Sequence, residues 1–206
     1  MKIDTLSLGD YQTNCYIVRA DASETCVLID PGYEPEKILA WLRKENLALD
    51  AILLTHGHFD HVGAVRALVD ATGCALWIHP GDHVKPQNPT NAFFYPLANG
   101  AFPRLCFSED AVKIQAGGLC FTVRETPGHT DGSVCYFCED AMFSGDTLFE
   151  GSCGRTDLPG GDPARLRRSL CELNALEEAY RVYPGHGFST TLSEEKRFNP
   201  YLKGIL

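Results

Sequence analysis

Residues 55–61 read Thr55-His56-Gly57-His58-Phe59-Asp60-His61 and place four good metal ligands within six residues. They follow the apolar run 51–54, which predicts a short buried strand. In extended chain the side chains of the first two histidines point the same way, so both can reach one ion. A helix predicted next turns the aspartate and the third histidine toward a neighbouring position. Two ions about 3.5–4 Å apart would suit this arrangement.

Three later segments share this feature, a β-like run followed by a glycine-containing turn that carries a histidine or an aspartate. The β-like runs 122–124, 141–143 and 181–183 lead into Gly128-His129, Gly145-Asp146 and Gly185-His186. Glycine lets the backbone turn sharply, and strand-end loops are where a rigid scaffold positions catalytic groups. The predicted ligand set therefore has seven nitrogen and oxygen donors: His56, His58, Asp60, His61, His129, Asp146 and His186.

An alternative interpretation makes these histidines ordinary turn and core residues. It is disfavoured because five of the seven histidines of the chain fall in the pattern, together with two spaced aspartates. The other two, His79 and His83, match no ligand position and are interpreted as polar loop residues. Nitrogen and oxygen ligands favour Zn²⁺, although Fe and Mn would also be accepted.

Composition limits the class of protein. The 206 residues are 44% apolar and 22% charged, which is typical of a globular chain, and we expect one domain over residues 1–206. The formal net charge of −9 disfavours nucleic acid as a partner. No apolar run approaches the ~20 residues of a spanning helix, and the N-terminus lacks the apolar region of a secretory signal. We therefore expect a cytoplasmic protein that does not bind membranes; the oligomeric state is not predicted.

Nine cysteines fit a reducing compartment in which thiols stay free. Five of them lie in apolar, strand-like runs and are expected to be buried: Cys15, Cys26, Cys120, Cys135 and Cys138. Cys135 and Cys138 resemble half of a zinc site, but positions i and i+3 of a strand face opposite sides. The buried, metal-free interpretation is preferred for this pair.

Strand-like and helix-like runs alternate from end to end, which predicts a layered α/β (α+β) architecture. Strands are predicted at 14–18, 25–29, 51–54, 75–78, 112–115, 119–124, 133–137, 141–143 and 180–183. Helices are predicted at 34–45, 62–69 and 163–173, with a last helix opening at Ser193. The segment 85–103 has four prolines and three consecutive aromatic residues. It is either a lid over a site or a loop tied down by its own rings.

The combined motifs resemble the metallo-β-lactamase-fold hydrolases. Residues 126–133 (Thr-Pro-Gly-His-Thr-Asp-Gly-Ser), 145–149 (Gly-Asp-Thr-Leu-Phe) and 183–187 (Tyr-Pro-Gly-His-Gly) are similar to the glyoxalase II branch, the hydroxyacylglutathione hydrolases. The resemblance implies an αββα sandwich with the site at one edge between the sheets. It also implies that His56, His58, His129 and a bridging Asp146 hold one metal. The second metal would be held by Asp60, His61, His186 and the same Asp146.

The resemblance implies hydrolysis of acyl thioesters, above all S-2-hydroxyacylglutathione such as S-D-lactoylglutathione, or of another low-molecular-weight thiol ester. A metal-bridging hydroxide would attack the acyl carbonyl, and Asp60 would serve catalysis by holding one of the two metals. A thiol of pKa about 8.5 leaves without a strong general acid. Such an activity would belong to methylglyoxal detoxification. True β-lactamases of this fold usually have Cys where Asp146 stands, which argues against that activity.

The chain departs from long glyoxalase II enzymes in two places. Residues 187–206 alone follow His186, so the chain is similar to the short-form enzymes. Gly154-Arg155-Thr156-Asp157 stands where the long enzymes contact glutathione. Arg155 is either an anchor for a substrate carboxylate or the partner of Asp157 or Asp162 in an ion pair.

The same run 154–157 also resembles the persulfide dioxygenases, which share the fold. Those enzymes bind a single iron through residues matching His56, His129 and Asp146, and oxidise glutathione persulfide with O₂. Lactonases of the fold share the ligand set and are a further alternative. A non-enzymatic binding module is disfavoured because no ligand position is missing.

Overall fold

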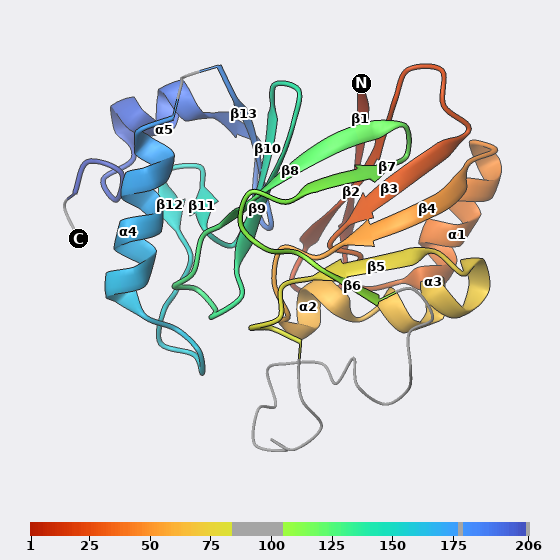
Figure 1. The fold of residues 1–206 in the computed structure, drawn as a ribbon, viewed down its shortest axis with the longest axis horizontal. Helices are drawn as coiled ribbons and strands as arrows, with labels where there is room; N and C mark the ends of the chain where they lie inside the picture. Colours follow the sequence, from red (N-terminus) through yellow and green to blue (C-terminus); the bar gives the residue numbers. More distant parts are fainter. Residues whose placement is uncertain (84–104, 177–178, 205–206) are drawn as a thin grey trace.

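Two six-stranded β-sheets lie at the centre of the computed structural model, which describes residues 1–83, 105–176 and 179–204 (Figure 1). The first sheet has the order β1 (Lys2–Leu8), β2 (Thr13–Arg19), β3 (Thr25–Ile29), β4 (Ala48–Leu53), β5 (Ala75–Ile78) and β6 (Leu105–Phe107). The second has the order β14 (Thr190–Thr191), β13 (Arg181–Pro184), β10 (Ala141–Gly145), β9 (Val134–Cys138), β8 (Leu119–Glu125) and β7 (Lys113–Ala116). A small hairpin joins β11 (Leu148–Phe149) to β12 (Ser152–Cys153).

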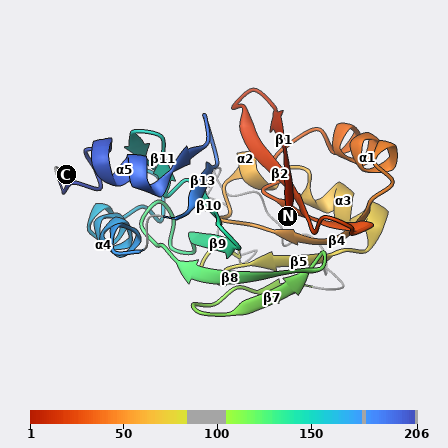
Figure 2. The ribbon, with the colours of Figure 1, turned by 90° about the horizontal axis from the view of Figure 1, so that it is seen from above.

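Helices cover the outer face of each sheet (Figures 1 and 2). The first sheet packs against α1 (Pro35–Lys44) and α3 (Val65–Thr72), and the short α2 (Phe59–Val62) lies beside them. The second sheet packs against α4 (Pro163–Asn174) and α5 (Leu192–Phe198). These layers form the αββα sandwich that the family resemblance implied.

Successive side chains along a strand point to opposite faces of its sheet. They form three apolar layers, which lie between the four layers of helices and sheets. On β3, Cys26 and Leu28 face the helices, whereas Val27 and Ile29 face the second sheet. Both faces of the strand are apolar because the sheet is covered on both sides. Cys135 and Cys138 likewise lie in different layers, which confirms that they face opposite sides of β9.

The strand directions bring the predicted ligand loops to one edge of the second sheet. Strands β8 and β10 both run antiparallel to β9, and β10 runs parallel to β13. The carboxyl ends of β8, β10 and β13 therefore point the same way, and the segments carrying His129, Asp146 and His186 begin there. The backbone N–H of Val134 donates to Thr55 O (2.8 Å), which ties this edge to the chain following β4.

Several sequence predictions need correction. The helix predicted over 62–69 is divided into α2 and α3, because the Ala64 N–H donates to Pro31 O (3.1 Å) and Gly63 packs directly on the backbone of Gly32. The last helix begins at Leu192 with Thr191 as its N-cap, so Ser193 lies inside it. Cys120 is exposed rather than buried because it lies on the solvent side of β8.

Some elements were not predicted at all. The alternation of polar and apolar residues along the edge strand β1 is interrupted at Asp4-Thr5, and the short strands β6, β11, β12 and β14 are too brief to show a strand pattern. The segment 85–103, predicted to be a lid or a tied loop, falls outside the described residues. Among the helices that are described, none is long and apolar enough to cross a membrane.

Candidate metal centre

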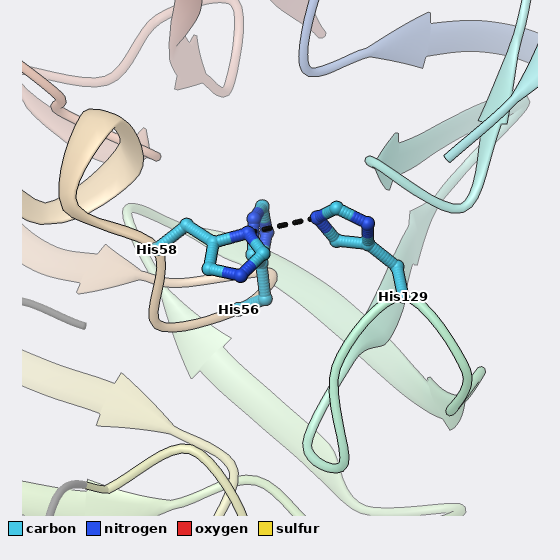
Figure 3. Close-up of side chains that lie close together, drawn as sticks. All are labelled: His56, His58 and His129. Carbon is cyan, nitrogen blue, oxygen red and sulfur yellow. Dashed lines mark hydrogen bonds between the residues drawn. The ribbon is translucent and has the colours of Figure 1, made fainter. Parts of the chain in front are cut away.

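Three buried histidines form the first half of the cluster (Figure 3). His56 and His58 lie on the loop between β4 and α2, and His129 comes from the loop after β8 in the other sheet. One ring nitrogen from each lies within 4.8 Å of the other two, and His58 Nδ1 is 2.8 Å from His129 Nε2. The spacing allows one ion to contact all three rings.

A second group lies beside the first and contains Asp60, His61 and His186. Asp60 Oδ2 is 3.2 Å from His186 Nε2 and 3.6 Å from His61 Nε2, and the two imidazole nitrogens are 3.3 Å apart. Helix α2 carries Asp60 and His61, so its first turn rotates them away from His58 as the sequence predicted. His186 follows β13 in the second sheet.

Asp146 lies between the two groups. Its Oδ2 is 3.5 Å from His129 Nε2 in the first group and 3.6 Å from His186 Nε2 in the second. Its Oδ1 is 3.4 Å from His61 Nε2. The structure thus brings all seven predicted ligand residues together, with the Asp146 carboxylate between the two groups.

Outer partners orient the ligand rings. His129 Nδ1 donates to Arg155 O (2.8 Å) and His186 Nδ1 donates to Tyr11 O (3.1 Å). A carbonyl accepts but cannot donate, so the proton stays on Nδ1 and the Nε2 lone pair faces the centre. Ring nitrogens with this arrangement are ready to bind a cation.

Two buried atoms show that a cation fits this cluster. His56 Nε2 and Asp146 Oδ1 make no hydrogen bond to any described residue, although both are shielded from solvent. Buried polar atoms are almost always satisfied, so His56 Nε2 requires a partner that the polypeptide does not supply, and Asp146 Oδ1 has only the His61 ring at 3.4 Å. A divalent ion bound to nitrogen and oxygen donors provides that partner.

The electrostatics of the cluster favour a bound cation in place of protons on the first group. Burial lowers the pKa of His58 to about 3, and the neighbouring rings of His129 and His61 act in the same direction. Burial also lowers the pKa of His56 well below its usual range. Burial alone would raise the pKa of the Asp146 carboxyl, but the charge of His61 outweighs it and lowers that pKa. In the first group the rings of His56 and His58 are therefore neutral, and they lie beside an ionised Asp146 carboxylate.

Two buried aspartates support the cluster, and neither role was predicted from the sequence. Asp30 accepts hydrogen bonds from the backbone and hydroxyl of Thr55 (2.8 and 2.6 Å) and from His61 Nδ1 (2.9 Å). The signal was present, because Asp30 follows β3 directly and precedes Pro31-Gly32, just as the ligands follow their strands. Asp82 accepts from the backbone N–H of Gly57 (2.9 Å) and Gly132 (2.7 Å) and so joins two ligand loops.

Glycine is required where the backbone touches the cluster. A Cβ on Gly185 would lie 2.2 Å from Asp146 Oδ1 and 2.7 Å from His61 Cε1. Gly145 adopts φ +49° just before Asp146, and a Cβ there would overlap Thr55 Oγ1 at 2.3 Å. These two glycines let the strand ends approach the ligands closely enough for one carboxylate to reach both groups.

A cavity of about 480 Å³ opens above the cluster. Its walls combine cluster residues with apolar and aromatic side chains and with Arg155: Tyr11, His58, Phe59, Asp60, His129, Asp146, Phe149, Cys153, Arg155, Leu158 and His186. Arg155 both lines this cavity and pairs with Asp157, so each of the two interpretations of Arg155 has a structural counterpart. Asp162 instead caps α4 by accepting the N–H groups of Ala164 and Arg165.

The fold and the cluster together define an αββα-sandwich metalloprotein with a histidine–aspartate site for divalent cations. The chain belongs to the metallo-β-lactamase superfamily, whose members are hydrolases. The match to this family covers residues 8–186.

The chain is similar to proteins with several activities. It is 32% identical over 212 residues to the hydroxyacylglutathione hydrolase GloC of Haemophilus influenzae, covering 98% of each chain. The crystal structure of the BLEG-1 B3 metallo-β-lactamase superposes with a TM-score of 0.86 at 37% identity, covering 98% of this chain and 100% of that one. ETHE1 from Myxococcus xanthus superposes with a TM-score of 0.83 at 31% identity, covering 99% and 85%.

Proposed function

We propose that the protein hydrolyses acyl thioesters of low-molecular-weight thiols, S-D-lactoylglutathione or a close analogue, with two divalent metal ions. The observation that carries this proposal is the position of Asp146 between two ligand groups at the base of an open cavity. The similarity to a hydroxyacylglutathione hydrolase supports the same reaction class.

Each ligand group would hold one ion. His56, His58 and His129 would hold the first, Asp60, His61 and His186 the second, and Asp146 both. Bound divalent ions at such a site lower the pKa of water to near neutrality and polarise a carbonyl oxygen. Zn²⁺ suits these donors, and Fe or Mn suits them as well.

The remaining residues bind and orient. Arg155 O and Tyr11 O fix the rings of His129 and His186, so the ligand lone pairs stay aimed at the centre. The apolar side chains of Phe59, Phe149 and Leu158 border the cavity and limit water around a bound acyl group. A thiolate of pKa about 8.5 departs without protonation, so the site needs no separate general acid.

A single-iron persulfide dioxygenase is the second candidate. The similarity to ETHE1 and the shared run 154–157 favour it, and residues His56, His129 and Asp146 would hold the iron. This reaction consumes O₂, whereas thioester hydrolysis does not, so one experiment can separate the two.

The deciding experiment measures thiol release from S-D-lactoylglutathione by zinc-loaded and iron-loaded protein, with O₂ consumption on glutathione persulfide recorded in parallel. A lactone and a β-lactam serve as control substrates, the latter because of the similarity to BLEG-1. Rapid thiol release without O₂ uptake supports the proposal. O₂ uptake by the iron form, or faster opening of either control substrate, overturns it.

The proposed activity would place the protein in methylglyoxal detoxification in a reducing, cytoplasmic setting. Free thiols at seven positions support such a compartment: Cys15, Cys26, Cys120, Cys135, Cys138, Cys153 and Cys171. We propose a small-molecule thioester as the partner, with no role for nucleic acid or membranes.

A further inference from the structure

Arg155 and Asp157 form a two-pronged ion pair at the wall of the catalytic cavity. Arg155 Nε lies 2.6 Å from Asp157 Oδ1, and Arg155 Nη2 lies 2.6 Å from Asp157 Oδ2. Both side chains are solvent-exposed, at 61% and 65%. Asp157 therefore occupies the face of the guanidinium that would otherwise receive the carboxylate of a ligand.

The pair is located where two cavities meet. Arg155 and Cys153 line the cavity above the metal cluster and also a second cavity of about 300 Å³. The second cavity extends toward α4 and is bordered by Thr156, Leu166 and Tyr201. The hydrogen bond from His129 to Arg155 O keeps this junction close to the cluster. A substrate whose acyl group reaches the metals can lay its thiol half across Arg155 into the second cavity.

Arg155 carries the only lysine or arginine charge among the described residues that line the two cavities. The carboxylates in the same lining, Asp60 and Asp146, belong to the metal cluster. An anionic thiol half can therefore pair with one cation there, and Asp157 already neutralises it. The hydrogen bond from Arg155 lowers the pKa of Asp157 to about 2, so the competing carboxylate stays ionised at neutral pH.

We propose that Asp157 determines specificity at this site by competing with the substrate for Arg155. This role rests on the proposed thioesterase function and depends on the charge of the thiol half of the substrate. A thiol half with a carboxylate near the junction must displace Asp157, whereas a neutral thiol half binds across an ion pair that is already complete. Asp157 thus reduces the preference for glutathione-type thioesters over neutral ones.

The test compares kcat/KM for S-D-lactoylglutathione with that for the D-lactoyl thioester of N-acetylcysteamine, which has the same acyl group and no charge. The ratio of the two values is the quantity of interest. Asp157→Asn should raise it about two- to fivefold, because an exposed ion pair is worth up to about 1 kcal/mol. Arg155→Met should lower it, and the Asp157→Asn gain should shrink at high ionic strength.

Asp140→Asn is a matched control. Asp140 pairs with Arg181 through the same two guanidinium nitrogens, both at 3.0 Å and with similar exposure, but in the turn before β10. The Asp140→Asn substitution removes one negative charge and one equivalent ion pair without touching either cavity. The ratio of the two kcat/KM values should therefore stay constant. A ratio that rises equally in both variants, or that is unchanged in Asp157→Asn, overturns the proposal.

Calorimetric binding of S-methylglutathione to metal-loaded protein separates failure of this inference from failure of the proposed function. Tighter binding by Asp157→Asn in a protein without thioesterase activity would refute the function and retain the competition at Arg155. Thioester hydrolysis with equal binding of this ligand by wild type and Asp157→Asn would retain the function and refute the role of Asp157.

Discussion

The carboxylate of Asp30 lies 2.9 Å from Nδ1 of His61, on the opposite side of the ring from Asp146 and His186. Because the same carboxylate also accepts two hydrogen bonds from Thr55, it has no freedom to turn away. Asp30 therefore fixes the plane of the His61 ring and keeps the proton on Nδ1. It connects the end of β3 to the cluster without being one of the predicted ligands.

Replacing Asp30 by Asn should weaken metal binding at the second group. The amide nitrogen would face His61 Nδ1 and force the proton onto Nε2, the nitrogen that points to the centre. Loss of such an outer partner lowers metal affinity about 10–100-fold. Metal content after dialysis against a competing chelator measures the effect. Asp50→Asn is the control, because Asp50 holds the Gly117 N–H (2.8 Å) far from the cluster. Equal metal retention in both variants would contradict this role of Asp30.

Replacing Asp60 by Ala should remove most of the activity. Asp60 is the carboxylate closest to His186, at 3.2 Å, and without it the second ion would keep two histidines and Asp146. We expect kcat to fall by about 10²-fold or more, with metal content approaching half of the wild-type value. Asp10→Ala, an exposed acidic residue outside the cluster, should behave as wild type. Turnover close to normal at reduced metal load would refute the requirement for two metals.

The seven residues of the cluster could be predicted because each follows a strand signal at a glycine-containing turn. Their pattern is local, and glycine is needed at Gly145 and Gly185 whatever the rest of the chain does. The supporting residues were harder to predict. Asp30 and Asp82 act through hydrogen bonds to residues that lie 25 or more positions away in the sequence. An isolated aspartate in a turn looks the same in the local sequence with or without such partners.

The same distinction explains the fold predictions. The apolar runs within β3 and β4 reveal these buried strands, whereas the pattern along the edge strand β1 is interrupted by the consecutive polar residues Asp4 and Thr5. The division between α2 and α3 depends on contact of Gly63 with the turn at Gly32. That contact exists only after β3 and β4 have paired, so helical periodicity within 62–69 could not reveal it.

A buried carboxylate behind the cavity gives a prediction about stability. Glu195 on α5 accepts the Gly151 N–H (2.8 Å), Asn199 Nδ2 (2.7 Å) and the Thr190 hydroxyl (2.8 Å), while Asn199 also donates to Phe149 O (3.3 Å). These bonds hold the hairpin whose Phe149 side chain lines the cavity. Glu195→Ala should lower the free energy of unfolding by about 1–3 kcal/mol, because one buried donor (Asn199) and two partly buried donors (Gly151 and Thr190) lose their acceptor.

The same variant should raise KM more than it lowers kcat, since the cavity wall shifts while the ligands stay in place. Chemical denaturation and steady-state kinetics measure the two effects. Glu195→Gln retains an acceptor oxygen and should restore most of both, whereas Glu194→Ala, one residue earlier and exposed, should cost less than about 1 kcal/mol. Loss of kcat with unchanged KM would contradict the role of Glu195 in shaping the wall.

Metal binding should release protons near neutral pH. Burial alone would lower the pKa of His61, but the carboxylates of Asp146 and Asp30 outweigh it and raise that pKa well above the ordinary 6.5. In the metal-free protein the protonated ring therefore stabilises the fold fully below pH 6.5, and this stabilisation is lost as the pH rises through the raised pKa. An ion that binds His61 must displace the proton, so metal affinity should increase with pH across the same window.

Zinc titrations by calorimetry in buffers of different ionisation enthalpy, from about pH 6 to pH 9, measure the number of protons released. We expect about one proton from His61 at neutral pH and fewer as the pH rises. In Asp30→Asn the proton release should decrease, because one of the two carboxylates that raise the pKa of His61 is gone. Proton release that does not depend on pH, or that is the same in both proteins, would show that His61 is already neutral before the metal binds.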